Sequence, residues 1–76
     1  MDQSKPTIAE QIGVRVRDLR IDRKMSQNEL ARAIGTGQAA ISRIENNRGV
    51  NTTVETLSNI ASALNVNLVI YFKEAL

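Results

Sequence analysis

The stretch QNELARAIGTGQAAISRIEN, residues 27–46, decides the fold of this 76-residue chain. It opens on a helix-capping pattern, because Ser26 and Glu29 lie three residues apart and each side chain can bond the other's backbone N–H. Gly35 is the expected end of this short helix, since glycine adopts the left-handed conformation of a helix C-terminus at little cost. The residues expected to face inward are Leu30, Ala31 and Ile34.

A second short helix is predicted over residues 38–46, with Ile41 and Ile44 on its inward side. Only Thr36 and Gly37 separate it from the first helix, and Gly37 takes the position of its N-cap. Two short helices joined by a tight turn that contains glycine form a helix-turn-helix. The stretch therefore predicts this motif.

Helical patterns flank the motif on both sides. Before it, a helix is expected over residues 8–23 with Thr7 as a candidate N-cap. Its apolar stripe recurs every three or four residues and consists of Ile8, Ile12, Val16 and Leu19. After the motif, Thr52 and Glu55 match a further capping box. The helix that follows has its inward residues at Val54, Leu57, Ile60, Ala61 and Leu64.

Residues 66–73 change period, because apolar positions alternate there with a spacing of two and include β-branched and aromatic residues. This is the strand candidate of the chain, and a lone strand leaves its backbone groups unpaired. Pairing with the same strand of a second chain across a two-fold axis is the simplest solution. The alternative is a fifth helix over residues 66–75. The residues predicted at the dimer interface are Val66, Leu68, Val69, Ile70, Tyr71 and Phe72.

The composition excludes several classes of protein. The chain has no His and no Cys, which rules out zinc fingers, thiol catalysis, histidine acid–base catalysis and disulfide scaffolds. No metal, no cofactor and no enzymatic activity are therefore expected. The longest apolar run, residues 68–72, is too short to span a bilayer, and the polar N-terminus does not resemble a signal peptide. We expect one cytoplasmic domain over residues 1–76.

Charge is distributed unevenly along the chain, although the formal net charge is only +2. Residues 15–48 hold eight of the ten Lys and Arg but four of the eight Asp and Glu. This excess favours a surface that faces a polyanion. A solvated helix face with a modest positive excess explains the same numbers, so charge alone leaves both interpretations open.

The motif and its surroundings resemble the Cro/lambda-repressor-like (XRE) helix-turn-helix family from Ile12 to Val66. The resemblance rests on a spaced set: Q-x-x-L-A at 27–31, the glycine at 35, I-S-R-I-E-N at 41–46 and T-L-x-x-I-A-x-A-L at 56–64. It implies a small helical bundle whose third helix is presented to the DNA major groove. Thr36 and Gly37 depart from the Val and the Ser or Thr common at these family positions, and neither change contradicts DNA binding.

The end of the chain narrows the resemblance. Residues 65–72 are similar to the terminal strand of the HipB-type antitoxins, in which that strand joins two subunits. The expected fold is therefore mainly α: a lambda-repressor-like bundle of four helices, or five if the end is helical, with a C-terminal strand at 66–73 pairing across a homodimer. The resemblance also implies autorepression and a kinase-like toxin as partner.

The outward positions of the third helix are the expected base-reading residues, because that helix enters the groove. Gln38 is the strongest of them, since its amide can pair with adenine N6 and N7. Arg43 suits guanine or a phosphate, and the methyl group of Ala39 suits thymine. The full set is Gln38, Ala39, Ser42, Arg43 and Asn46.

Phosphate contacts are expected around this surface. In the family, the residue matching Gln27 bridges a phosphate and the residue matching Gln38. Gly37 is included although it has no side-chain donor, and Arg23 is expected to add longer-range attraction. The complete set of predicted phosphate residues is Gln27, Gly37, Asn47, Arg48 and Arg17. The resemblance further implies a structural ion pair between Arg20 and Glu45.

These features predict a sequence-specific transcriptional repressor that binds an inverted repeat in double-stranded DNA as a homodimer. The antitoxin and autorepressor of a toxin–antitoxin pair is the favoured form. A phage-type repressor or a restriction–modification controller protein is the alternative within this class. The alternative from another class is a protein-interaction adaptor in which the helix-turn-helix is only a scaffold.

Overall fold

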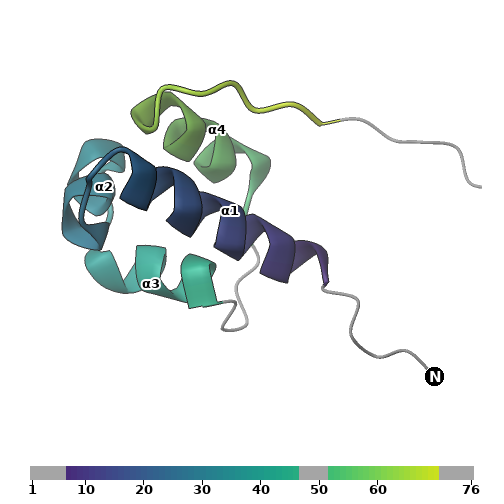
Figure 1. Cartoon of the computed structure of the whole chain (residues 1–76), viewed down its shortest axis with the longest axis horizontal. Helices are drawn as coiled ribbons and strands as arrows, with labels where there is room; N and C mark the ends of the chain where they lie inside the picture. The colour runs from purple at the N-terminus through teal and green to yellow at the C-terminus, as the bar shows by residue number, and fades with distance from the viewer. Residues whose placement is uncertain (1–6, 47–51, 71–76) are drawn as a thin grey trace, which may run out of the picture.

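The computed structural model describes residues 7–46 and 52–70. Over these residues the chain forms a helical bundle in which α1 and α2 both pack on α3, and α4 packs on α2 (Figure 1). The helices are α1 (Ile8–Asp22), α2 (Gln27–Ile34), α3 (Gln38–Asn46) and α4 (Val54–Ala63). The mainly helical, helix-turn-helix architecture is confirmed, and each predicted helix is found within one residue of its expected ends.

Side-chain caps begin three of the helices. Ser26 and Glu29 form the predicted capping box of α2, with Ser26 Oγ accepting from Glu29 N at 3.0 Å and Glu29 Oε1 accepting from Ser26 N at 2.7 Å. Thr7 and Glu10 form the same reciprocal pair at the start of α1. These bonds satisfy backbone donors that a helix cannot pair internally. Local sequence therefore fixes where α1 and α2 begin.

The cap of α4 lies one residue later than predicted. The hydroxyl of Thr53, not that of Thr52, accepts from Thr56 N at 3.1 Å. Since α4 begins at Val54, only Thr53 stands in the N-cap position, three residues before a free N–H. The expected box of Thr52 with Glu55 is therefore wrong, and residue 56 carries a hydroxyl instead of the carboxylate that a capping box requires.

Three helices end in the same left-handed turn. Gly35 has the predicted positive φ of 77°, and Thr36 N donates back to Ala31 O at 2.9 Å. Lys24 and Asn65 adopt equivalent conformations after α1 and α4, with φ values of 57° and 60°. This hydrogen-bond pattern satisfies the last carbonyls of a helix. Asn tolerates the conformation, whereas Lys is strained in it.

The core is aliphatic and lies between the four helices. Leu30, Ile41 and Leu64 are its largest fully buried side chains. Two residues expected to face inward are instead exposed, Ile8 at 76% and Val54 at 60%. Both occupy the first residue of their helices, where side chains lean back beyond the N-terminal end and away from the packed turns. Among the described residues, no helix combines the length and apolarity needed to cross a bilayer.

The chain leaves α4 as an extended segment (Figure 1). Residues 66–70 have no regular secondary structure, so the fifth helix is absent from this part of the chain. The predicted strand is not formed there either. A strand is defined by backbone hydrogen bonds to a neighbouring strand, and the described part of this single chain contains no such neighbour. Val66 packs against the core. Tyr71 and Phe72, also predicted at the interface, lie outside the described residues.

Candidate nucleic-acid interface

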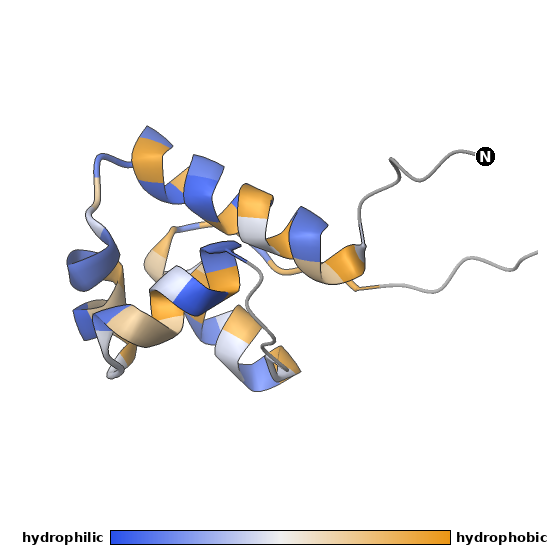
Figure 2. Ribbon diagram, turned by 90° about the horizontal axis from the view of Figure 1, so that it is seen from below, coloured by the Kyte–Doolittle hydropathy of each residue, from blue (hydrophilic) through white to orange (hydrophobic). Residues whose placement is uncertain are grey.

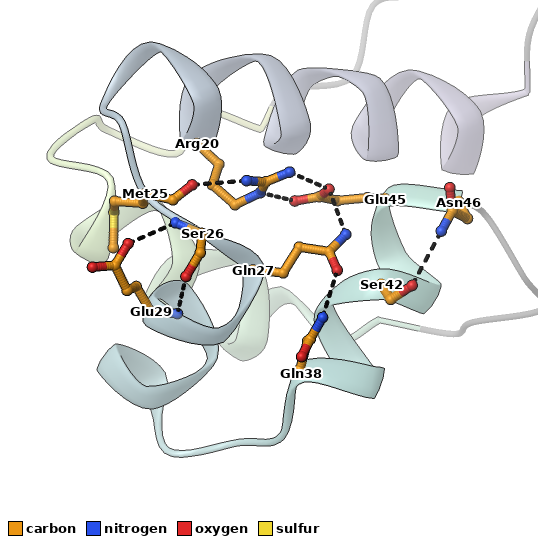
Figure 3. Close-up of polar contacts among 9 residues, drawn as sticks. All are labelled: Arg20, Met25, Ser26, Gln27, Glu29, Gln38, Ser42, Glu45 and Asn46. Atoms are coloured by element: carbon orange, nitrogen blue, oxygen red, sulfur yellow. Dashed lines mark hydrogen bonds and ion pairs between the residues drawn. The ribbon is translucent and has the colours of Figure 1, made fainter.

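The outer side of α3 is polar and open to solvent. Ile41, Ile44 and Glu45 form its buried side, and a helix places residues four apart on one face. Asn46 Nδ2 donates to Ser42 Oγ at 3.1 Å, so these two side chains hold each other (Figure 3). Of the residues predicted to read bases, Ser42 is half-buried, and the exposed ones are Gln38, Ala39, Arg43 and Asn46.

A buried ion pair joins α1 to α3 behind this surface. Arg20 Nε lies 2.6 Å from Glu45 Oε2, and Arg20 Nη2 donates to Glu45 Oε1 at 3.1 Å. Glu45 is 6% exposed. The hydrogen bond to Glu45 raises the pKa of Arg20 above its ordinary range, against the opposing effect of burial. Arg20 Nη1 also donates to the carbonyl of Met25 at 2.7 Å, which ties the ion pair to the turn after α1.

Two glutamines extend this ion pair to the surface (Figure 3). Gln27, the first residue of α2, donates through Nε2 to Glu45 Oε1 at 3.0 Å. Gln38, the first residue of α3, donates through Nε2 to Gln27 Oε1 at 3.3 Å. The resemblance had implied two separate pairs, Arg20 with Glu45 and Gln27 with Gln38, and the structure joins them through the bond from Gln27 to Glu45. We refer to Arg20, Glu45, Gln27 and Gln38 as the polar relay.

Gly13 allows α1 to approach α3 closely, and sequence reasoning missed it. A Cβ atom at this position would lie 2.5 Å from the carbonyl oxygen of Ile44 and 2.8 Å from that of Glu45. Both neighbours are backbone atoms, which cannot move aside as a flexible side chain can. The sequence could have pointed to this contact, because Gly13 lies in the middle of a predicted helix. Glycine destabilises a helix interior there, so its presence indicates that a neighbouring element packs closely against it.

The predicted phosphate residues fall at different places. Arg17 is exposed, and it lies four residues after Gly13 and three before Arg20, hence on the side of α1 that faces α3. Gly37 is exposed, with open space around the position of a Cβ. Asn47 and Arg48 lie outside the described residues.

Arg23 has a role inside the chain that was not predicted. Its Nε donates to the carbonyl of Leu64 at 2.7 Å, and its Nη1 donates to Asp22 Oδ2 at 3.0 Å. The first bond ties the end of α1 to the end of α4. A cation beside the last carbonyls of a helix is also favourable electrostatically.

The sequence matches a known protein family. A family model described as helix-turn-helix matches residues 16–70. The chain belongs to the XRE-type helix-turn-helix family. The matched range contains the whole motif, the polar relay and α4, so the XRE-type assignment rests on the same residues that build this interface.

Three individual proteins are similar to this chain, one in sequence and two in solved structures. The ImmF control region 10 kDa protein of Bacillus phage phi105 is 37% identical over 57 residues, which cover 75% of this chain but only 62% of that protein. A chain in the structure of the HipA–HipB–O2–O3 complex is 31% identical, with a TM-score of 0.73 over 93% of this chain and 99% of that one. SinR, a master regulator for biofilm formation solved in complex with DNA, is 30% identical, with a TM-score of 0.69 over 74% and 89%.

Proposed function

We propose that the chain is a sequence-specific DNA-binding transcriptional regulator that inserts α3 into the major groove. The observation that carries this proposal is the exposed polar row on α3, backed by a buried side that holds the helix rigidly in the bundle. An α-helix fits the major groove of B-DNA, and the N-terminal residues of the recognition helix contact base edges. The similarity to SinR in complex with DNA supports the same role.

The proposed base-reading residues are Gln38, Ala39, Ser42, Arg43 and Asn46. Gln38 stands at the N-terminal end of α3 and is exposed, as direct readout requires. Because Asn46 bonds Ser42, this pair offers its remaining polar groups as a unit. Arg43 extends from the same exposed side and is the one cation among them.

Phosphate contacts position the protein without reading sequence. We assign this role to Gln27 at the N-terminal end of α2, to Gly37 directly before α3, and to Arg17 on the neighbouring side of α1. Asn47 and Arg48 complete the proposed set. Each Lys or Arg that neutralises a phosphate releases counterions, so the affinity is expected to fall steeply as salt rises.

A homodimer is the second part of the proposal, and the apolar surface at the end of the chain supports it. Leu68, Val69 and Ile70 are exposed, Val69 at 77%. They border a groove of about 570 Å³ together with Ile8 and Ile12 of α1. Figure 2 shows apolar residues both at the start of α1 and in the segment that follows α4. A second copy that pairs its residues 66–73 with these would complete the predicted strand and cover the exposed apolar residues.

Selection from a pool of random DNA tests the function directly. The full chain is expected to enrich an inverted repeat whose half-sites lie about one helical turn, ~34 Å, apart. Gln38→Ala is expected to relax the preference at one position per half-site, whereas Asn59→Ala, an exposed amide on α4, should leave every preference unchanged. A chain that binds no DNA at low salt would instead be the protein-interaction adaptor.

Within this class we propose that the regulator is the autorepressor and antitoxin of a toxin–antitoxin pair. The similarity to a chain of the HipA–HipB–O2–O3 complex, which extends over nearly the whole of both chains, favours this form. A phage-type repressor is the second candidate, favoured by the similarity to the phage phi105 protein. Binding to the DNA upstream of the chain's own gene, with a kinase-like gene beside it, supports the antitoxin. Binding without such a gene supports the repressor.

A further inference from the structure

The polar relay connects the interior of the bundle to the exposed side of α3. Its hydrogen bonds converge on the Glu45 carboxylate: Arg20 donates to it from the interior, and on the other side Gln38 donates to Gln27, which donates to Glu45 (Figure 3). Three helices contribute to it, because Arg20 lies on α1, Gln27 on α2, and the other two residues on α3.

The carboxylate fixes the amide of Gln27. A carboxylate that binds a guanidinium has only acceptors, so the group that Gln27 turns toward it must be the amide nitrogen. The opposite orientation would place the amide oxygen against Glu45 Oε1 at 3.0 Å. Two acceptors facing each other repel, and although Arg20 Nη2 still donates to Glu45 Oε1, the Gln27 oxygen would face it without a donor, which is costly.

The orientation of Gln27 in turn fixes Gln38. With its nitrogen directed at Glu45, Gln27 has its oxygen on the side of α3, so Gln38 must approach it with its amide nitrogen. One of the two N–H groups of Gln38 is used in this contact. The second N–H and the carbonyl oxygen remain to be offered outward, as a donor beside an acceptor. Adenine presents the complementary pair at N7 and N6 in the major groove, whereas guanine presents two acceptors.

We propose that Glu45 is a positioning residue for base recognition, because it sets, through Gln27, the edge that Gln38 offers to the DNA. This inference rests on the proposed function, in which α3 reads bases. Its consequence is a preference for adenine over guanine at the base pair that Gln38 contacts. Arg20 takes part by holding the carboxylate in place with two hydrogen bonds.

Two substitutions break the relay at different points. With Glu45→Gln, the new amide can face Gln27 with its oxygen or its nitrogen, so neither orientation of Gln27 and Gln38 is enforced. With Gln27→Met, the link is removed while the ion pair of Arg20 with Glu45 remains. Both variants are expected to lose about tenfold of the adenine-over-guanine preference at the position identified by Gln38→Ala. Combining them should cause no further loss.

The experiment is a competition between operator variants, each with one base pair changed, using the full chain and the site it selects from random DNA. Glu55→Gln, an exposed carboxylate on α4, is the matched control and should keep every preference. Thermal melts monitor folding separately. If Glu45→Gln does not fold, Gln27→Met still tests the step from Gln27 to Gln38, since it leaves the buried ion pair intact, and unchanged base preferences in this variant would overturn the relay.

The outcomes separate the relay from the function on which it rests. A purely structural Glu45 would weaken binding to all sequences alike while Gln27→Met leaves the base preferences unchanged, and that result overturns the relay. A wild-type chain that prefers guanine at the Gln38 position overturns it as well. A wild-type chain that selects no sequence overturns the proposed function, and the relay with it.

Discussion

Two sides of the molecule differ in whether a single chain supplies all the contacts that its side chains need. One side carries the polar relay, and the other carries residues 66–70. On the relay side, charged and amide groups from three helices find partners within the chain, and no described buried polar side-chain atom lacks one. On the other side, Leu68, Val69 and Ile70 remain exposed next to an apolar groove. This difference supports the proposal that one chain builds its own recognition surface, whereas its other side is completed by a second chain.

Glu45→Ala is expected to have the largest effect, because it leaves the Arg20 guanidinium buried without its partner. Breaking one partner of a buried pair costs about 3 kcal/mol, and DNA affinity should fall with it. Chemical denaturation followed by circular dichroism measures the loss. An unchanged melting temperature would show that the relay side does not depend on this pair for its stability.

Gly13→Ala is expected to have the second-largest effect, since the added methyl group would press on the backbone of α3 at Ile44 and Glu45. The expected loss is about 2 kcal/mol, the cost of overpacking at a tight contact. Gly37→Ser serves as the control, because space is open there, and it should change the free energy of unfolding very little. Equal stabilities of the two variants would contradict the close approach of α1 to α3.

Val69→Asp tests the other side of the comparison. It places a charge on an exposed residue that borders the groove, so a single chain should fold as before while the proposed dimer weakens about tenfold or more. Sedimentation equilibrium reads the change. Val14→Asp, on an exposed residue of α1 that does not line this groove, is the control. If the wild-type and Val69→Asp proteins have the same mass in solution, residues 66–70 do not form the dimer interface.

Lys24→Gly is expected to have the smallest effect, and a stabilising one. Lys24 has a φ of 57°, which glycine adopts without strain, so the gain should be about 1 kcal/mol. Lys24→Ala keeps the strain and should bring no such gain. Thermal melts of the two variants distinguish them, and an equal rise in both would contradict a backbone origin.

Short-range chemistry explains why so much of the fold could be predicted. The Ser26–Glu29 capping box and Gly35 involve residues close in sequence, and they defined α2 before any packing was considered. The spacing of Ile41 and Ile44 likewise identified the outward positions of α3. Arg20 and Glu45 came from a family resemblance, because a contact between residues 25 positions apart has no local signal.

The parts that sequence did not predict depend on packing or on competition between neighbours. Thr52 and Thr53 are equivalent as caps until the first turn of α4 is placed. Nothing in the local sequence predicts the left-handed backbone conformation of Lys24, because the point at which α1 ends imposes it. Similarly, a helical stripe marks Ile8 as apolar, but only the arrangement of the helices shows that no neighbour covers it.

The left-handed turns after α1, α2 and α4 also bear on how the protein assembles over time. Each closes by bonds between residues five apart or fewer, and helical bundles with such local contacts fold within about microseconds to milliseconds. Joining two chains is slower and depends on their concentration. In the proposed dimeric repressor, the number of chains made, and not the folding of each one, would therefore set the delay before repression begins.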